Sequence, residues 1–282
     1  MPFANVRGVK INYEVIGNHG PWMALSPGGR RALDNVRPLA QHLAGHGYRV
    51  LVHDRRNCGV SDIVIGGEQS EYETWADDQH ELLRQLNALP AIVGGSSSGC
   101  RLSLIFALKF SYDVRALLLW RVTGGAFAAA RLTENYYSKY IRAAQEGGMA
   151  AVCDLEHFKE RIEARPSNRT TLMAMDPKVF IAAMERWREQ FRKGAELPVI
   201  GASERDLGSI KVPTIIIPGN DKTHGHAVGE AAHRMIPGSE LVDLFPGDLD
   251  IDLVPPEDWT AKDGEMAAVF GDFLKRAQAK AA

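Results

Sequence analysis

A Gly-x-Ser-x-Gly motif centred on Ser97 contains the side chain of this sequence best suited to covalent chemistry. The motif, residues 95–99, follows the apolar run 89–93 and precedes a helical pattern at 101–110. A sharp strand-to-helix turn strains its central residue, so the positions two residues away must be small. Such a turn raises the Ser97 hydroxyl above a sheet edge and aims the Ser98 amide at the same point. We therefore interpret Ser97 as a nucleophile; a glycine-rich connecting loop or a phosphate-binding loop is the alternative.

The segments around this motif alternate between strand-like and helix-like patterns. Strand-like segments cover residues 8–15, 22–25, 48–53, 89–93, 114–120, 214–217 and 240–245. Segments with helical spacing cover residues 36–46, 72–88, 101–110, 227–235 and 265–280. Repeated strand–helix units predict an α/β fold, with a mostly parallel sheet and helices on both faces.

One long region interrupts this alternation. From about residue 126 to about residue 206 the sequence shows helical patterns and almost no strand signal. We expect an inserted helical lid at 125–206, over a core formed by 1–124 and 207–282. Aromatic and methionine stripes in the lid are most often ordinary core, and some are expected to line an apolar pocket.

The composition suits a globular protein and excludes several function classes. Of the 282 residues, 45% are hydrophobic and 24% are charged, and the net charge is −2. This charge gives no electrostatic basis for binding nucleic acid or a membrane surface. We also expect no spanning helix and no signal peptide. The three cysteines are far apart and fit neither a disulfide framework nor a metal site, which favours a cytoplasmic protein.

Taken together, the motifs resemble the α/β-hydrolase fold family with a helical lid, and the resemblance extends over nearly the whole chain. It rests on the elbow at 95–99, on Ser-Pro-Gly-Gly at 26–29, on the Asp-to-Ser turn at 54–61 and on Pro-Gly-Asn-Asp at 218–221. The family places its triad acid after the strand that precedes this last motif, and its triad follows the order Ser, acid, His. The resemblance thus implies that Asp221 is the acid; a helix-capping or turn role is the alternative.

The histidine of the family's triad is missing from its usual place. The segment after the strand at 240–245 contains no histidine, and none occurs beyond His233. Asp248 stands near the expected position as a candidate base. A carboxylate is a weak base at its ordinary pKa of about 4, but clustering with Asp250 and Asp252 would raise that pKa. An exposed acidic edge strand is the alternative.

A second candidate base lies just past the expected acid. His224 comes three residues after Asp221, where the resemblance places a residue beside the pocket. Its alternatives are a helix-capping or a surface histidine. The pair His224 and His226 would also suit a metal, but no third ligand is spaced with it. We expect neither a metal nor a cofactor.

Two backbone amides are the expected oxyanion donors. One is that of Ser98, which follows the nucleophile, and the other is that of Gly29 in the early loop, with Gly28 as its alternate. Both amides would stabilise the negative charge that develops on an acyl oxygen during attack.

Candidate substrate contacts are found at the same sheet edge. Arg30 follows the early glycines, and Trp120 and Arg121 stand at the end of the strand 114–120. Because arginine matches carboxylates in geometry, these residues favour a substrate with an anionic oxygen. The alternative is that the arginines pair with aspartates of the loops.

The sequence thus predicts a serine hydrolase that attacks an ester, lactone or related acyl bond of a small, partly apolar molecule. The alternative, which the missing histidine keeps open, is a non-hydrolytic member: a lyase, a cofactor-free acid–base catalyst, or a ligand-binding protein without turnover. We expect a small-molecule substrate as the partner, neither nucleic acid nor membrane, and leave a homodimer open.

Overall fold

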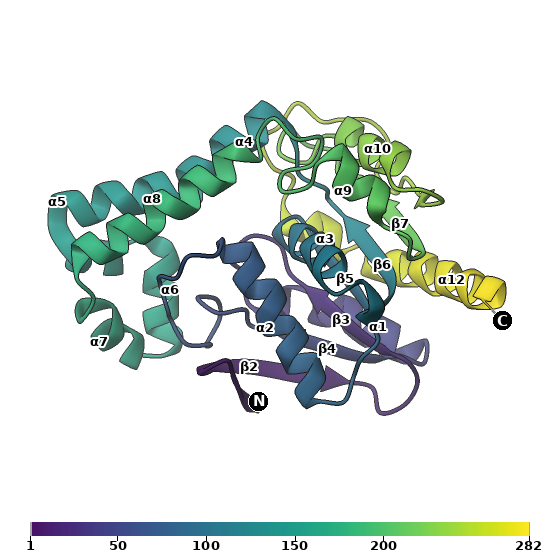
Figure 1. The fold of residues 1–282 in the computed structure, drawn as a ribbon, viewed down its shortest axis with the longest axis horizontal. Coiled ribbons are helices and arrows are strands. Elements are labelled where there is room, and N and C mark those ends of the chain that lie inside the picture. The colour runs from purple at the N-terminus through teal and green to yellow at the C-terminus, as the bar shows by residue number, and fades with distance from the viewer. Residues whose placement is uncertain (1, 282) are drawn as a thin grey trace.

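An eight-stranded sheet organises the computed structural model, which describes residues 2–281 (Figure 1). The strands are β1 (Phe3–Val6), β2 (Val9–Ile16), β3 (Trp22–Ser26), β4 (Arg49–His53), β5 (Ala91–Ser96), β6 (Val114–Trp120), β7 (Thr214–Ile217) and β8 (Glu240–Leu241). Their order across the sheet is β1-β2-β4-β3-β5-β6-β7-β8. The pairs from β4 to β8 are parallel, whereas β1, β2 and β4 pair antiparallel at one edge. The mostly parallel sheet predicted from the sequence is confirmed.

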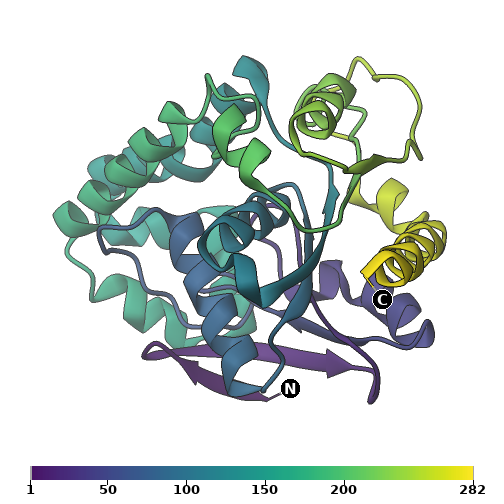
Figure 2. The same cartoon turned by 45° about the vertical axis from the view of Figure 1, so that its right-hand side comes forward.

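Helices cover both faces of this sheet (Figures 1 and 2). The helices of the core are α1 (Arg37–Gly45), α2 (Glu71–Gln85), α3 (Ser98–Lys109), α10 (His226–Met235), α11 (Pro256–Thr260) and α12 (Asp263–Ala281). α1 and α12 pack together on one face, whereas α2 and α3 cover the other. Among residues 2–281, no helix combines the length and the apolarity needed to cross a bilayer.

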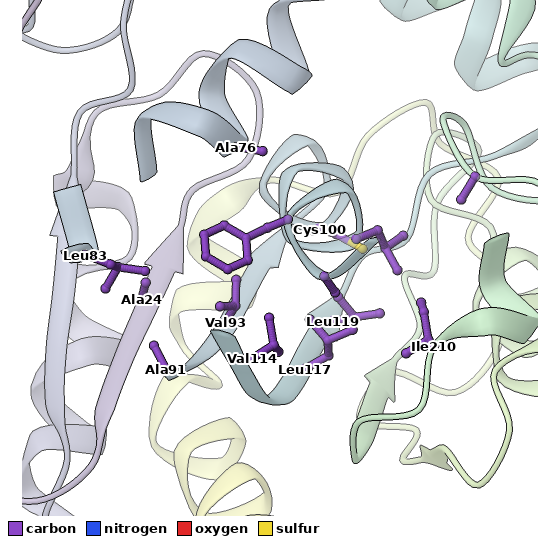
Figure 3. Packing of buried hydrophobic residues seen from close by; sticks show 14 of the residues in the cluster. Ala24, Ala76, Leu83, Ala91, Val93, Cys100, Val114, Leu117, Leu119 and Ile210 are labelled. Atoms are coloured by element: carbon purple, nitrogen blue, oxygen red, sulfur yellow. The ribbon is translucent and has the colours of Figure 1, made fainter. Parts of the chain in front are cut away.

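Alternate residues of β6 fill the two cores on either side of the sheet. Leu117 and Leu119 belong to the core under α2 and α3, where they lie near Val93 and Cys100 (Figure 3). Leu118, between them in sequence, belongs to the core under α1 and α12. Because a strand points successive side chains to opposite faces, a strand buried on both faces has to be apolar throughout.

A helical insertion separates β6 from β7, and most of it lies to one side of the sheet in Figure 1. It contains α4 (Gly125–Thr133), a π-helical turn (Glu134–Ser138), α5 (Lys139–Cys153), α6 (Glu156–Ala164), α7 (Ser167–Met173), α8 (Pro177–Lys193) and α9 (Glu204–Ser209). Its aromatic residues, including Tyr140, Phe158 and Trp187, form a third core with Tyr72 and Trp75 of α2. The boundary expected at 206/207 falls inside α9, and the role of the insertion as a lid stays a prediction.

The last strand is shorter than the sequence predicts. β8 contains only Glu240 and Leu241 of the expected strand 240–245. The Val242 amide still donates to the Ile216 carbonyl of β7, but the next residues form a turn in which the carboxylate of Asp243 accepts a hydrogen bond from the Phe245 amide. Three of the four residues at 242–245 are apolar, which made the segment resemble a strand. Because an edge strand can pair on one side only, fewer backbone hydrogen bonds hold it in the sheet.

Two elements were not expected from the sequence. β1 pairs with β2 across a turn in which Arg7 and Gly8 both have positive φ, 49° and 80°, a conformation typical of tight hairpins. α11 begins at Pro256, whose fixed φ suits the first position of a helix. Its five residues are too few to give a periodic pattern.

The turn between β5 and α3 requires glycine for reasons of space. A Cβ at Gly95 would lie 2.3 Å from the carbonyl carbon of Gly99, and a Cβ at Gly99 would lie 2.1 Å from the carbonyl oxygen of Ser26. Between them Ser97 has a φ of 53° and a ψ of −109°, which is unfavourable for a residue with a side chain. The two glycines let β5, α3 and the end of β3 approach closely enough to impose that conformation.

We predict that Gly99→Ala destabilises the protein by about 3 kcal/mol, because the added methyl group overlaps the backbone of Ser26 and neither chain can yield. Gly45→Ala is the matched control, since nothing lies within 4 Å of a Cβ at that position. Urea unfolding of both variants measures the effect. Equal free energies of unfolding for the two variants would show that the elbow tolerates a side chain.

Candidate active site

The hydroxyl of Ser97 lies at the carboxyl end of β5, where it contacts a histidine. The distance from Ser97 Oγ to His224 Nε2 is 2.8 Å. Ser97 is 9% exposed and His224 is 2% exposed, so both groups are shielded from bulk water. The structure therefore brings together a hydroxyl and an imidazole that are 127 residues apart in the sequence.

The second ring nitrogen of this histidine contacts the expected acid. His224 Nδ1 lies 2.9 Å from Asp221 Oδ1, and the same oxygen accepts hydrogen bonds from the amides of Thr223 and His224 at 3.0 and 2.8 Å. The turn that follows β7 thus holds the acid and the imidazole three residues apart. Gly219 makes this turn possible, because a Cβ there would lie 2.3 Å from the Cβ of His224.

The other oxygen of Asp221 is held by two further parts of the chain. Arg121 Nη2 and the Val254 amide donate hydrogen bonds to Asp221 Oδ2 at 3.1 and 2.9 Å. Arg121 also donates to the Val254 carbonyl at 3.2 Å. We expected Arg121 to contact substrate, but its guanidinium is buried and paired with Asp221. Arg121 therefore positions the acid, and because it also lines the cavity its contact with substrate stays a prediction.

The pKa values of the pair are shifted in the same direction for different reasons. Burial by itself would raise the pKa of Asp221, but hydrogen bonds and charge from His224, the Val254 amide and Arg121 hold that pKa below its usual range. Burial lowers the pKa of His224 to about 4, and the positive charge of Arg121 adds to this, against the opposing effect of Asp221. At neutral pH, Asp221 is therefore ionised and His224 is neutral. With Nδ1–H donated to Asp221, His224 Nε2 can accept the Ser97 proton.

The two expected oxyanion donors belong to two segments next to Ser97, the early glycine loop and the start of α3. The Ser98 amide is the first of α3, where amides have no partner within the helix. The carbonyl of Gly29 accepts hydrogen bonds from Ser98 Oγ at 2.6 Å and from Arg55 Nη2 at 2.7 Å. These bonds tie the early loop to the start of α3. A Cβ at Gly28 would lie 3.4 Å from that of Ser97, so the loop passes directly beside the hydroxyl.

A carboxylate behind this loop fixes its other end. Asp54 accepts hydrogen bonds from the Leu33 amide at 2.7 Å and from the Val60 amide at 3.0 Å. A Cβ at Gly59 would lie 2.0 Å from the Asp54 carboxyl carbon. The Asp-to-Ser turn of the sequence therefore has a structural role: it positions the glycine loop.

A cavity of about 110 Å³ contains these groups. Ser97 and His224 lie in its wall with Trp120, and the insertion contributes Arg131 and Tyr136. The arrangement offers a nucleophile, a base, two amides for an oxyanion and a partly enclosed space for a small molecule.

Two other residues predicted for the site, Asp248 and Arg30, are absent from the wall of this cavity. Asp248 is exposed, and its carboxylate accepts a hydrogen bond from the His226 amide at 2.9 Å. Asp250 is exposed as well and pairs with Lys222 at 2.6 Å, so the aspartates form no buried cluster. Asp248 therefore lacks the burial that would make it a base.

Arg30 requires a similar correction. Its guanidinium is buried and donates to Glu71 at 2.9 Å, and it stacks near the rings of Tyr136, Tyr137 and Tyr140. This pairing ties the early loop to α2 and to the insertion. Arg30 is therefore not free to bind substrate in the cavity.

Several residues of the cavity could not be identified from the sequence. Arg131 and Tyr136 belong to the insertion, whose helical pattern does not reveal which side faces the site. Trp259 and Asp263 come from α11 and the first residue of α12. The only sequence signal for the latter pair is an acid at a helix start, which more often has a capping or dipole role.

Comparisons with known proteins identify relatives of this fold. A family model described as the alpha/beta hydrolase fold matches residues 21–120. The uncharacterized hydrolase YraK of Bacillus subtilis is 35% identical over 113 residues, which are 40% of this chain and 41% of that protein. The alignment thus spans less than half of that relative. The 2-hydroxy-6-oxo-2,4-heptadienoate hydrolase of Pseudomonas putida is 24% identical over 228 residues, or 76% of each protein.

Solved structures extend the likeness to the whole chain. The enol-lactonase from Burkholderia xenovorans LB400 has a TM-score of 0.64 and 22% identity, and the comparison covers 97% of this chain and all of that one. At this level of identity the likeness concerns the fold. The family match includes the elbow at 95–99 but ends before the turn that contains Asp221 and His224.

We predict that the reactivity of Ser97 is retained in mildly acidic solution. A base must be neutral to accept a proton, so the rate should fall only below the pKa of His224, which burial lowers to about 4 from 6.5. Labelling by a fluorophosphonate probe should rise about tenfold per pH unit below that value and level off above it. Circular dichroism at each pH checks that the protein stays folded. A limb centred near pH 6.5 would instead indicate a solvent-exposed imidazole.

Proposed function

The chain belongs to the α/β-hydrolase fold superfamily, and from this premise we propose that it is a serine hydrolase of ester, lactone or related acyl bonds in a small, partly apolar molecule. The observation that supports this proposal most directly is the hydrogen-bonded series Ser97–His224–Asp221. The names of similar proteins, a hydrolase of a dienoate and an enol-lactonase, agree with it.

In the proposed mechanism, His224 Nε2 takes the proton of Ser97 as Oγ attacks the acyl carbon. The acyl oxygen becomes negative and accepts hydrogen bonds from the amides of Gly29 and Ser98. His224 then gives the proton to the leaving oxygen, and the bond from that oxygen to the acyl carbon breaks. Water, deprotonated by His224, attacks the acyl–Ser97 ester in turn, which releases the acid and restores the hydroxyl.

Asp221 and Arg121 act on this base without touching substrate. The Asp221 carboxylate accepts the Nδ1 proton of His224 and stabilises the imidazolium that forms during attack. Arg121 keeps Asp221 ionised and opposes protonation of His224 in the resting enzyme. The same arrangement supports hydrolysis over the non-hydrolytic alternative, because His224 lies where a base for Ser97 is needed.

The substrate that we propose carries an anionic group. Arg31 and Arg131 line the cavity, and neither forms an ion pair with any residue of the range 2–281. Unpaired guanidinium groups at a pocket favour a carboxylate or a similar anion. Because Arg131 and Tyr136 belong to the insertion, we further propose that the insertion is a lid, which completes the pocket over the sheet.

We predict that Ser97→Ala and His224→Ala each lower the turnover of p-nitrophenyl butanoate by about 10⁴-fold or more, because members of one catalytic unit are not additive. The double variant should be no slower than either single one. Asp248→Asn is the matched control and should change kcat/KM less than about twofold, since Asp248 is exposed and away from Ser97.

Steady-state kinetics on purified, folded variants tests the roles of nucleophile and base. Turnover by Ser97→Ala at the rate of the wild type would exclude covalent serine catalysis. A mild effect of His224→Ala together with a large effect of Asp248→Asn would transfer the role of base to the aspartate.

The anionic preference is tested with a pair of esters of equal length, the p-nitrophenyl monoester of glutaric acid and p-nitrophenyl pentanoate. We predict that Arg131→Gln lowers kcat/KM about tenfold for the first ester and less than twofold for the second, because a charge-assisted hydrogen bond is lost. Arg115→Gln, at the opposite end of β6 from Trp120, is the control and should affect neither ester. Equal losses for both esters with Arg131→Gln would contradict an anion-binding role.

A further inference from the structure

One wall of the cavity is polar, although it lies outside the catalytic series. Trp259 of α11 and Asp263 at the start of α12 both line the space that contains Ser97 and His224. Trp259 is 5% exposed and Asp263 is 7% exposed. Both residues thus belong to the wall of the space that contains the nucleophile, and both are nearly excluded from bulk water.

The polar atoms of these two residues have no partner within the described chain. Trp259 Nε1 and Asp263 Oδ2 are both buried without a hydrogen bond to any group in residues 2–281. Asp263 also forms no ion pair with any residue in that range. Leaving such a group unsatisfied destabilises a protein by about 1–3 kcal/mol. Unpartnered polar groups that line a pocket are accordingly candidates for ligand contacts.

The side chain of Trp259 is held in place by its neighbours. Its ring stacks on Phe245 at a centroid distance of 4.1 Å, and the guanidinium of Arg121 lies 5.2 Å from its centroid. The indole N–H therefore has a fixed orientation, which lowers the entropic cost of binding a ligand group.

The carboxyl of Asp263 differs from the other acid of the same helix turn. Glu265 is exposed and pairs with Lys262, as expected for an acid at a helix start. Asp263 is instead buried, which raises its pKa to about 7. Near neutral pH its carboxyl is therefore partly protonated, and either form can bond to a hydroxyl group, as acceptor or as donor.

We propose that Trp259 and Asp263 form a subsite for a hydroxyl group of the substrate, so that the enzyme acts on hydroxylated acyl compounds. The proposal rests on the serine hydrolase function proposed above. A hydroxyl can accept a hydrogen bond from the indole N–H and also bond to the carboxyl. A methyl group would leave both polar groups unsatisfied. An ammonium group fits less well, because Arg31, Arg121 and Arg131 line the same cavity and repel a cation.

The experiment measures binding, so that it does not depend on turnover. Calorimetry measures the affinity of the wild-type protein for two pairs of acids whose members differ by one hydroxyl. The pairs are 3-hydroxybutanoate with butanoate and 6-hydroxyhexanoate with hexanoate. We expect the hydroxylated member of one pair to bind about tenfold more tightly. Asp263→Leu should bring the two affinities within about twofold while the affinity for the unsubstituted acid is retained.

Three further variants keep the test specific. Trp259→Phe removes only the N–H and should lower the preference, and Asp263→Asn retains hydrogen-bonding groups and should keep most of it. Glu265→Leu removes an acid of the same helix turn outside the cavity and should leave the preference unchanged. Thermal unfolding identifies any variant that does not fold, and in that event the milder pair, Trp259→Phe and Asp263→Asn, gives the answer.

Equal affinity within every pair, or no binding of either acid at millimolar concentration, would overturn the subsite. Survival of the full preference in Asp263→Leu would overturn it as well. Hydrolysis of p-nitrophenyl butanoate is measured in parallel on the same preparations. Turnover without a hydroxyl preference would reject the subsite alone, whereas a preference without turnover would reject the hydrolase function and retain the binding site.

Discussion

The buried carboxylate of Asp221 connects three parts of the chain that are far apart in sequence. One oxygen accepts hydrogen bonds from the Thr223 amide and from the amide and ring of His224, and the other from Arg121 and the Val254 amide. An ionised carboxylate is strongly disfavoured in a protein interior unless both oxygens are satisfied. Folding around Asp221 therefore requires the end of β6, the turn after β7 and the loop before α11 to be in place together. The orientation of the imidazole depends on that arrangement.

The distance between nucleophile and base depends on how three neighbouring strands end. The Ser97 amide donates to the Trp120 carbonyl at 3.1 Å, and the Arg121 amide donates to the Ile217 carbonyl at 3.1 Å. The parallel ladder thus continues one residue past the ends of β5 and β6. Since parallel strands place their carboxyl ends at one edge, a serine after β5 and a turn after β7 reach across β6 to each other.

The sequence predicts the parts of the site that local pattern determines. β6 and β7 have the predicted bounds, because strands buried on both faces are continuous apolar runs. The spacing to Asp221 identified His224 as a candidate, but the choice between His224 and Asp248 depends on burial, which only the tertiary structure determines. The pairing of Arg30 with Glu71 and of Arg121 with Asp221 could not be predicted for a related reason. Their carboxylate partners lie 41 and 100 residues away, beyond any local signal.

The location of the base changes the contribution that the C-terminal segment has to make. In the usual order of this fold the histidine follows the acid from a later segment, whereas here the proposed base and acid share one turn. The segment 242–255 then needs to supply only the Val254 amide to Asp221. Its aspartates can therefore face solvent without weakening the hydrogen bonds of Ser97, His224 and Asp221. The next two elements of the chain, α11 and the start of α12, form a wall of the cavity with Trp259 and Asp263. The residues that we propose to bind the substrate hydroxyl therefore follow directly after the segment that elsewhere supplies the base.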